Sequence, residues 1–168
     1  MSAQLIFGGP LYFYRNLVYG TTTGGYLKLV DTPPGVLFYQ NTLIGQIRYF
    51  GPASNVHFLN NLIIADGWSP PVFALRTFTN YSTSDYNGFR ANPGAEFSYE
   101  WDSPPRGVAV DYQGPLQVRR FTTLEEYRDA TGQDKHSIPV DIDTFVKVTP
   151  PEKSDRSVST IRKASTSG

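Results

Sequence analysis

The chain has 168 residues, which is enough for one domain with a hydrophobic core. Its 15 basic and 15 acidic residues cancel, so no net charge draws it to nucleic acid or to an anionic membrane. The absence of cysteine excludes disulfides and thiolate metal sites, and no stretch has the roughly 18–20 apolar residues that span a bilayer.

A short pattern occurs three times between residues 11 and 63. Each copy has an aliphatic residue two positions before a phenylalanine and an asparagine three positions after it. The phenylalanines are Phe13, Phe38 and Phe58, and the asparagines are Asn16, Asn41 and Asn61. Short apolar strands that recur every 20 to 25 residues predict a solenoid of stacked coils.

Between these copies, short apolar runs alternate with clusters of Gly, Pro, Asn and Thr. We expect further strands at 26–30 and 46–50, an apolar segment at 72–75, and the next asparagine in phase at Asn87. If the coils stack in parallel about 4.8 Å apart, the phenylalanines form one interior column. The asparagines are then predicted to form a ladder, each amide donating to one neighbour and accepting from the other.

The pattern changes after residue 92. Residues 96–101 alternate strictly, which places Phe97, Tyr99 and Trp101 on one face of a strand. Further strands are expected at 108–110, 116–118 and 138–148.

One helix is expected near residue 124. Thr123 and Glu126 fit a capping box, Leu124 and Tyr127 share one face, and Gly132 is placed to end the helix. A helix of about two turns is not stable alone, so we expect it to pack on the coils as their C-terminal cap.

The expected organisation is therefore all-β, with coils over 1–92, strands and a capping helix over 93–148, and a disordered tail over 149–168. The tail is rich in Pro, Ser and Lys. Leu11 and Phe13 do not make a polar cap, so we expect further coils or another chain to cover the N-terminal end. The first ten residues lack the pattern of a signal peptide.

The outward side chains of the repeated strands are the main candidates for binding. Tyr12, Tyr14, Tyr39 and His57 are predicted on the outer face, where aromatic rings stack on sugars. The alternative is that the aromatic residues of 96–101 fold back and cover this face. His57 has no acid partner in phase, so an ordinary surface histidine is favoured over a general base.

Three pairs of side chains are candidates for metal or acid–base sites. Asp141 and Asp143 are expected on one face of the last strand, Asp85 and Asn87 lie near a bend, and His136 lies close to Asp134. Solvated surface positions and turns are favoured for all three pairs. No metal site is predicted, and Ca²⁺ is not supported by a motif.

Three segments together resemble the C-terminal region of right-handed parallel β-helix proteins of the pectate-lyase-like type. They are the repeat itself, residues 84–88 (Ser-Asp-Tyr-Asn-Gly), and residues 121–137, which end in Thr-Gly-Gln-Asp-Lys-His-Ser. The resemblance implies a right-handed parallel β-helix of about four coils, secretion, and an association with polysaccharides. It transfers no catalytic residue, because nothing in this chain matches a lyase motif.

The expected function is therefore a β-helix module of a carbohydrate-associated protein, acting as a scaffold and binding a glycan. Two alternatives stay open. One is part of a polysaccharide lyase or glycoside hydrolase, and the other is a structural β-helix that stacks end to end with another chain. Residues 80–82, Asn-Tyr-Ser, also fit the N-glycosylation pattern.

Overall fold

The structure is a computed structural model that describes residues 2–4, 10–18, 26–30, 35–49, 55–65, 71–77, 81–105 and 114–144. These residues form three β-sheets and one α-helix, which confirms the all-β class. No helix in these ranges is long and apolar enough to cross a membrane. Residues 108–110 and 149–168, for which a strand and a tail are predicted, lie outside the described ranges.

The three sheets are almost entirely parallel. Sheet A contains β1 (Ser2–Gln4), β4 (Tyr26–Val30), β7 (Gln46–Tyr49), β10 (Phe73–Arg76), β13 (Tyr99–Ser103) and β14 (Gln117–Phe121). Sheet B contains β2 (Leu11–Tyr14), β5 (Val36–Tyr39), β8 (Val56–Leu59) and β11 (Thr83–Asp85). Sheet C contains β3 (Leu17–Val18), β6 (Thr42–Ile44), β9 (Leu62–Ile64), β12 (Gly88–Arg90) and β15 (Ile138–Pro139). Among the strand pairs in the described ranges, only β13 and β14 are antiparallel.

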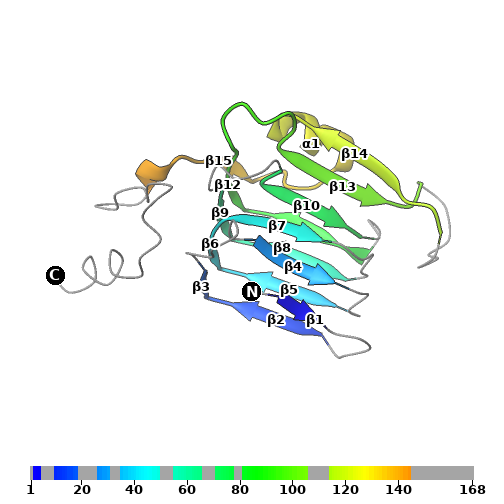
Figure 1. The fold of residues 1–168 in the computed structure, drawn as a ribbon, viewed down its shortest axis with the longest axis horizontal. Coiled ribbons are helices and arrows are strands. Elements are labelled where there is room, and N and C mark those ends of the chain that lie inside the picture. Colours follow the sequence, from blue (N-terminus) through cyan, green and yellow to red (C-terminus); the bar gives the residue numbers. More distant parts are fainter. Residues whose placement is uncertain are drawn as a thin grey trace, which may run out of the picture.

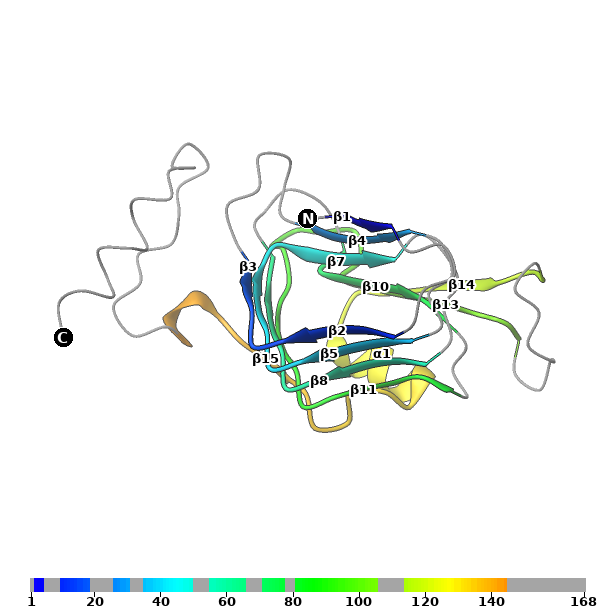
Figure 2. The same cartoon turned by 90° about the horizontal axis from the view of Figure 1, so that it is seen from below.

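From β2 onward the chain visits the sheets in a fixed order. It passes from sheet B to sheet C to sheet A four times, and each strand lies beside the equivalent strand of the next pass. Figure 2 shows the result: sheets A and B face each other, and sheet C closes one side between them. The passes follow one another along the length of the molecule, and helix α1 (Leu124–Thr131) lies at the end beside β14 (Figure 1).

The interior of sheet B holds the predicted phenylalanine column. Phe13 pairs in register with Phe38, and Phe38 pairs with Phe58, with ring centroids 5.2 and 5.1 Å apart. Phe73 reaches Phe58 from the opposite sheet, edge to face at 5.3 Å. The column forms because the side-chain period of a strand is two and the register is exact, so equivalent residues stack on one face.

The predicted asparagine ladder is also present. The side-chain amide of each asparagine donates to Oδ1 of the next, from Asn16 to Asn41 at 2.9 Å and onward to Asn61 and Asn87 at 3.0 Å each. The backbone N–H of each donates to the same oxygen. Asn41, Asn61 and Asn87 are buried, so the ladder satisfies polar groups that water cannot reach.

The residue before each ladder asparagine has a left-handed backbone. Arg15, Gln40, Asn60 and Tyr86 have φ between 53° and 56°. This conformation turns the chain sharply between sheets B and C. It places the asparagine inside the bend and the preceding side chain outside it.

Helix α1 forms as predicted. The Thr123 hydroxyl accepts the N–H of Glu126, the Glu126 carboxylate accepts the N–H of Thr123, and Gly132 ends the helix at φ 72°. Tyr127 is fully buried and its ring stacks on Tyr99 at 5.2 Å. The helix therefore covers the aromatic core at this end of the sheets.

Two expectations about the C-terminal part are wrong. Tyr99 and Trp101 belong to the core and do not cover the outer face of sheet B, because β13 continues the parallel order of sheet A. Phe97 lies before β13, under the guanidinium of Arg120 at 4.6 Å.

The strand predicted over 138–148 is short in the described residues. It ends at Pro139 and is followed by the 3₁₀ turn η2 (Ile142–Thr144). The cause is local: the Asp141 carboxylate accepts the N–H of Ile142, and its carbonyl accepts the N–H of Thr144. Asp141 and Asp143 therefore do not share the face of a strand.

Candidate functional site

The outer face of sheet B is a regular grid of side chains from β2, β5, β8 and β11. The parallel register sets two rows across these strands. One row is Tyr12, Leu37, His57 and Thr83, and the other is Tyr14, Tyr39, Leu59 and Asp85. All eight alternate with the inward residues of the same strands, so all lie on one surface.

The four residues predicted from sequence are brought together on this grid. Tyr12 is 69% exposed and Tyr14 is 53% exposed, while Tyr39 is half-buried beside Tyr14. The Arg15 guanidinium lies 4.9 Å from the centre of the Tyr14 ring. The N-terminal part of the face is therefore an aromatic surface with a cation at its edge.

His57 lies one strand away from this tyrosine cluster. Its Nδ1 is 2.9 Å from the Thr83 hydroxyl, and partial burial lowers the pKa of its imidazole. A lowered pKa keeps the ring neutral at pH 7. His57 therefore serves as a neutral hydrogen-bonding group on the face.

A polar column that the sequence analysis missed borders the grid. Arg15, Gln40, Asn60 and Tyr86 project from the bends between sheets B and C and line an open hollow above the ladder asparagines. Arg15 Nε donates to the Gln40 side chain at 3.1 Å. The signal was in the sequence, because each of these residues directly precedes a ladder asparagine.

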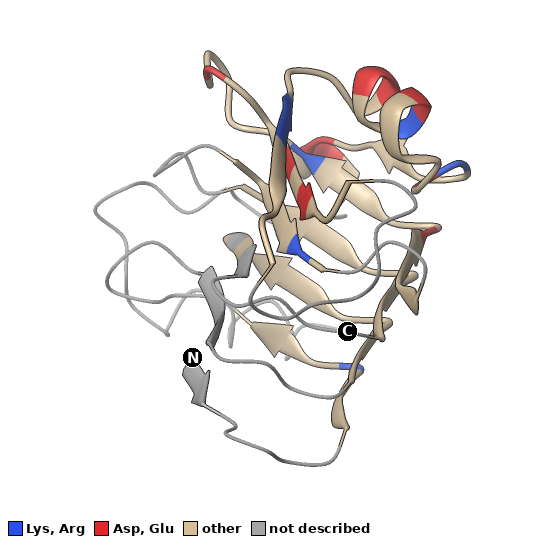
Figure 3. Ribbon diagram, turned by 90° about the vertical axis from the view of Figure 1, so that its right-hand side faces the viewer, with Lys and Arg blue, Asp and Glu red and all other residues tan. Residues whose placement is uncertain are grey.

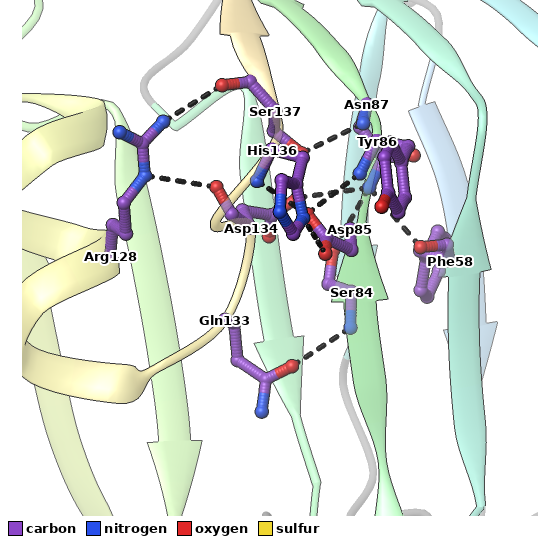
Figure 4. Close-up of polar contacts among 10 residues, drawn as sticks. All are labelled: Phe58, Ser84, Asp85, Tyr86, Asn87, Arg128, Gln133, Asp134, His136 and Ser137. Carbon is purple, nitrogen blue, oxygen red and sulfur yellow. Dashed lines mark hydrogen bonds and ion pairs between the residues drawn. The ribbon is translucent and has the colours of Figure 1, made fainter.

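The far end of the face is closed by a contact between Asp85 and His136 (Figure 4). The His136 Nδ1 lies 2.7 Å from the Asp85 carboxylate, and its ring stacks on Tyr86 at 4.7 Å. Burial opposes ionisation of Asp85, but hydrogen bonds from the side chain and backbone of His136 and from the Tyr86 N–H outweigh it and lower the pKa. Asp85 is thus an ionised acceptor that fixes the loop after α1 onto β11.

His136 and Asp134 do not form the pair considered from sequence. Asp134 is buried, where it accepts from Asn87 at 2.9 Å and from the Ser137 hydroxyl at 2.6 Å. Asn87 is likewise committed to the ladder and does not join Asp85 in a cation site. Within the described ranges, no group of three or more His, Asp or Glu side chains is arranged to hold a metal.

Figure 3 shows charged residues on α1 and also on several strands. In sheet B, however, Asp85 is the only Asp, Glu, Lys or Arg among the residues of β2, β5, β8 and β11. The outer face of sheet B is therefore suited to an uncharged or weakly charged polar ligand. Comparisons with protein-family models, with curated proteins and with solved structures returned no match.

Proposed function

We propose that this protein is a right-handed parallel β-helix module of a carbohydrate-associated protein of the pectate-lyase-like type. The four passes through sheets B, C and A in constant order support the β-helix. Right-handedness follows the strong general preference of crossovers between parallel strands. In this proposal the asparagine ladder and the phenylalanine column are scaffold.

We further propose that the outer face of sheet B binds a glycan. The observation that carries this proposal is the side-by-side placement of Tyr12, Tyr14 and Tyr39 on consecutive strands, with two of the rings more than half exposed. Aromatic rings offer flat apolar surface to the C–H face of a pyranose, and their hydroxyls remain available for hydrogen bonds. Gln40, Asn60 and His57 add polar groups beside the rings.

A glycan array followed by calorimetric titration tests this function. The wild-type chain is compared with a Tyr12→Ala/Tyr39→Ala double variant and with Tyr12→Phe/Tyr39→Phe, which keeps the rings. Loss of ring surface is expected to weaken binding about tenfold or more, whereas the phenylalanine variant retains most of the affinity.

Val118→Ala is the control, since Val118 is exposed on β14, far in the fold from sheet B. Absence of any saturable glycan, or equal affinity of wild type and the alanine variant, would contradict the proposal.

A further inference from the structure

A second hollow lies at the capped end of the molecule, away from the outer face of sheet B. It has a volume of about 700 Å³, within the range of roughly 300–1,000 Å³ typical of small-molecule sites. Its walls come from the end of β12, the segment before β13, the first turn of α1, and the segment after β15.

The floor of this hollow is apolar. Phe89, Tyr99 and Leu124 all line it and all belong to the hydrophobic core. Pro139 and Val140 form part of the wall. A ligand that fills the hollow therefore needs an apolar body.

The Tyr99 hydroxyl is the unusual group in this floor. The Tyr99 side chain is only 3% exposed, yet its hydroxyl makes no hydrogen bond to any residue in the described ranges. Unlike the Tyr127 hydroxyl, the Tyr99 hydroxyl is not fully enclosed, and Tyr99 is one of the residues that line the hollow. Burial and the charge of Asp134 raise the pKa of Tyr99 well above its usual value, so the group remains a hydrogen-bond donor.

The hollow also has a cationic side. Two nitrogens of the Arg128 guanidinium donate to backbone carbonyls: Nε to Asp134 at 3.0 Å and Nη2 to Ser137 at 2.8 Å. No carboxylate in the described ranges forms an ion pair with Arg128, whereas Arg90 is paired with Asp141 at 2.9 Å. Arg128 is thus a half-buried positive charge at the wall without a carboxylate partner.

The first turn of α1 adds donors to the same wall. The N–H groups of Leu124 and Glu125 cannot bond within the helix, and no other backbone bond uses them in the described ranges. The positive end of the helix dipole favours an anion at this point. The Glu125 carboxylate is exposed and makes no ion pair with Arg128, so it stands at the rim.

We propose that this hollow binds a small organic carboxylate with an apolar, aromatic-sized body. The carboxylate accepts hydrogen bonds from the Tyr99 hydroxyl and lies near the Arg128 guanidinium and the start of α1. The apolar body rests on Phe89 and Leu124. This site is independent of the glycan face, because none of the residues lining it belongs to sheet B.

The test titrates the protein with 3-phenylpropionate and with 3-phenylpropionamide, a neutral analogue of nearly the same shape, by calorimetry and amide NMR shifts. We expect the acid to bind saturably and the amide to bind with an affinity at least about tenfold lower. Tyr99→Phe is the main variant, because it removes only a hydroxyl that supports no contact in the fold. The variant is expected to have the same thermal midpoint as wild type or a higher one. Its affinity for 3-phenylpropionate is expected to fall about tenfold.

Tyr86→Phe, which removes a hydroxyl from a tyrosine on another surface, is the matched control and is expected to bind like wild type. The proposal is overturned by equal binding of acid and amide, by equal binding of wild type and Tyr99→Phe, or by no saturation with the acid. The proposal would also be overturned if the acid changed the amide NMR shifts of sheet B residues alone.

Discussion

The side-chain amide of Asn87 donates to Oδ1 of Asp134 at 2.9 Å, so the row of asparagine amides ends on a buried carboxylate. Asp134 takes a left-handed backbone at φ 52°, as the residues of the bends do. Its carboxylate joins the last pass of the sheets to the loop that follows α1. Together with the Asp85–His136 contact, it links the sheets to the segment that follows α1.

We predict that Asp134→Asn makes the protein more stable than wild type at neutral pH. Burial raises the pKa of the Asp134 carboxyl, and the hydrogen bonds from Ser137 and Asn87 lower it only in part. The Asp134 carboxyl therefore contributes its full stabilisation below the pKa that it has in the unfolded chain, about 3.9. This stabilisation is lost as the pH rises through the higher pKa of the folded state.

Asparagine keeps the acceptor oxygen, tolerates the left-handed backbone and carries no charge to desolvate. Urea denaturation from pH 4 to 7 checks the prediction, and the advantage of the variant should grow with pH. A wild-type protein that gains stability relative to the variant over this range would show that the sign is wrong.

Asn61→Ala is predicted to lower the free energy of unfolding by about 3 kcal/mol or more. The substitution removes the amide bonds to the Phe38 carbonyl and to Asn87, and it leaves the buried backbone N–H of Asn41 without its acceptor. Asn60→Gly is the matched control, since Asn60 is exposed and glycine adopts its left-handed backbone freely. The control is expected to change stability by less than about 1 kcal/mol in the same denaturation experiment. Equal losses at the two positions would argue against the ladder.

Phe58→Ala is predicted to cost about 3–5 kcal/mol, because it opens a cavity between Phe38 and Phe73. Leu59→Ala, one residue on but on the outer face, should cost clearly less. Chemical denaturation of both variants provides the comparison. The interior column is refuted if Leu59→Ala is the more damaging change.

Thr123→Ala should destabilise the protein by about 1 kcal/mol, and Thr123→Ser should retain most of the stability. The reason is the capping box, in which only the hydroxyl of residue 123 accepts the Glu126 N–H. Thermal unfolding of the two variants measures the difference. If serine proves as harmful as alanine, the cap acts through packing and not through the hydrogen bond.

The features that were predictable from sequence are those written in a local or strictly periodic pattern. The ladder asparagines recur with a fixed offset from a phenylalanine, and the helix carries Thr123, Glu126 and Gly132 at the required spacing. Both patterns have one dominant physical interpretation. Asn87 could be placed because it is the next asparagine in phase with the first three, and its Oδ1 accepts both donors of Asn61.

The features that were missed depend on contacts between distant segments. Strict alternation showed that Tyr99 and Trp101 share a face, but it could not show that this face is the interior, because either side of a strand can be buried. The Asp85–His136 contact joins residues 51 positions apart, and the Tyr99 hydroxyl becomes notable only through its lack of a partner. No local pattern encodes such relationships.

The order of donors and acceptors gives the ladder a direction. Asn16 donates to Asn41, and the amides of Asn41, Asn61 and Asn87 each accept from the preceding pass and donate onward. A carboxylate accepts but has no N–H to pass on. Asp134 therefore ends the row of donors: the side-chain oxygen of another asparagine placed beyond it would find no N–H to accept from.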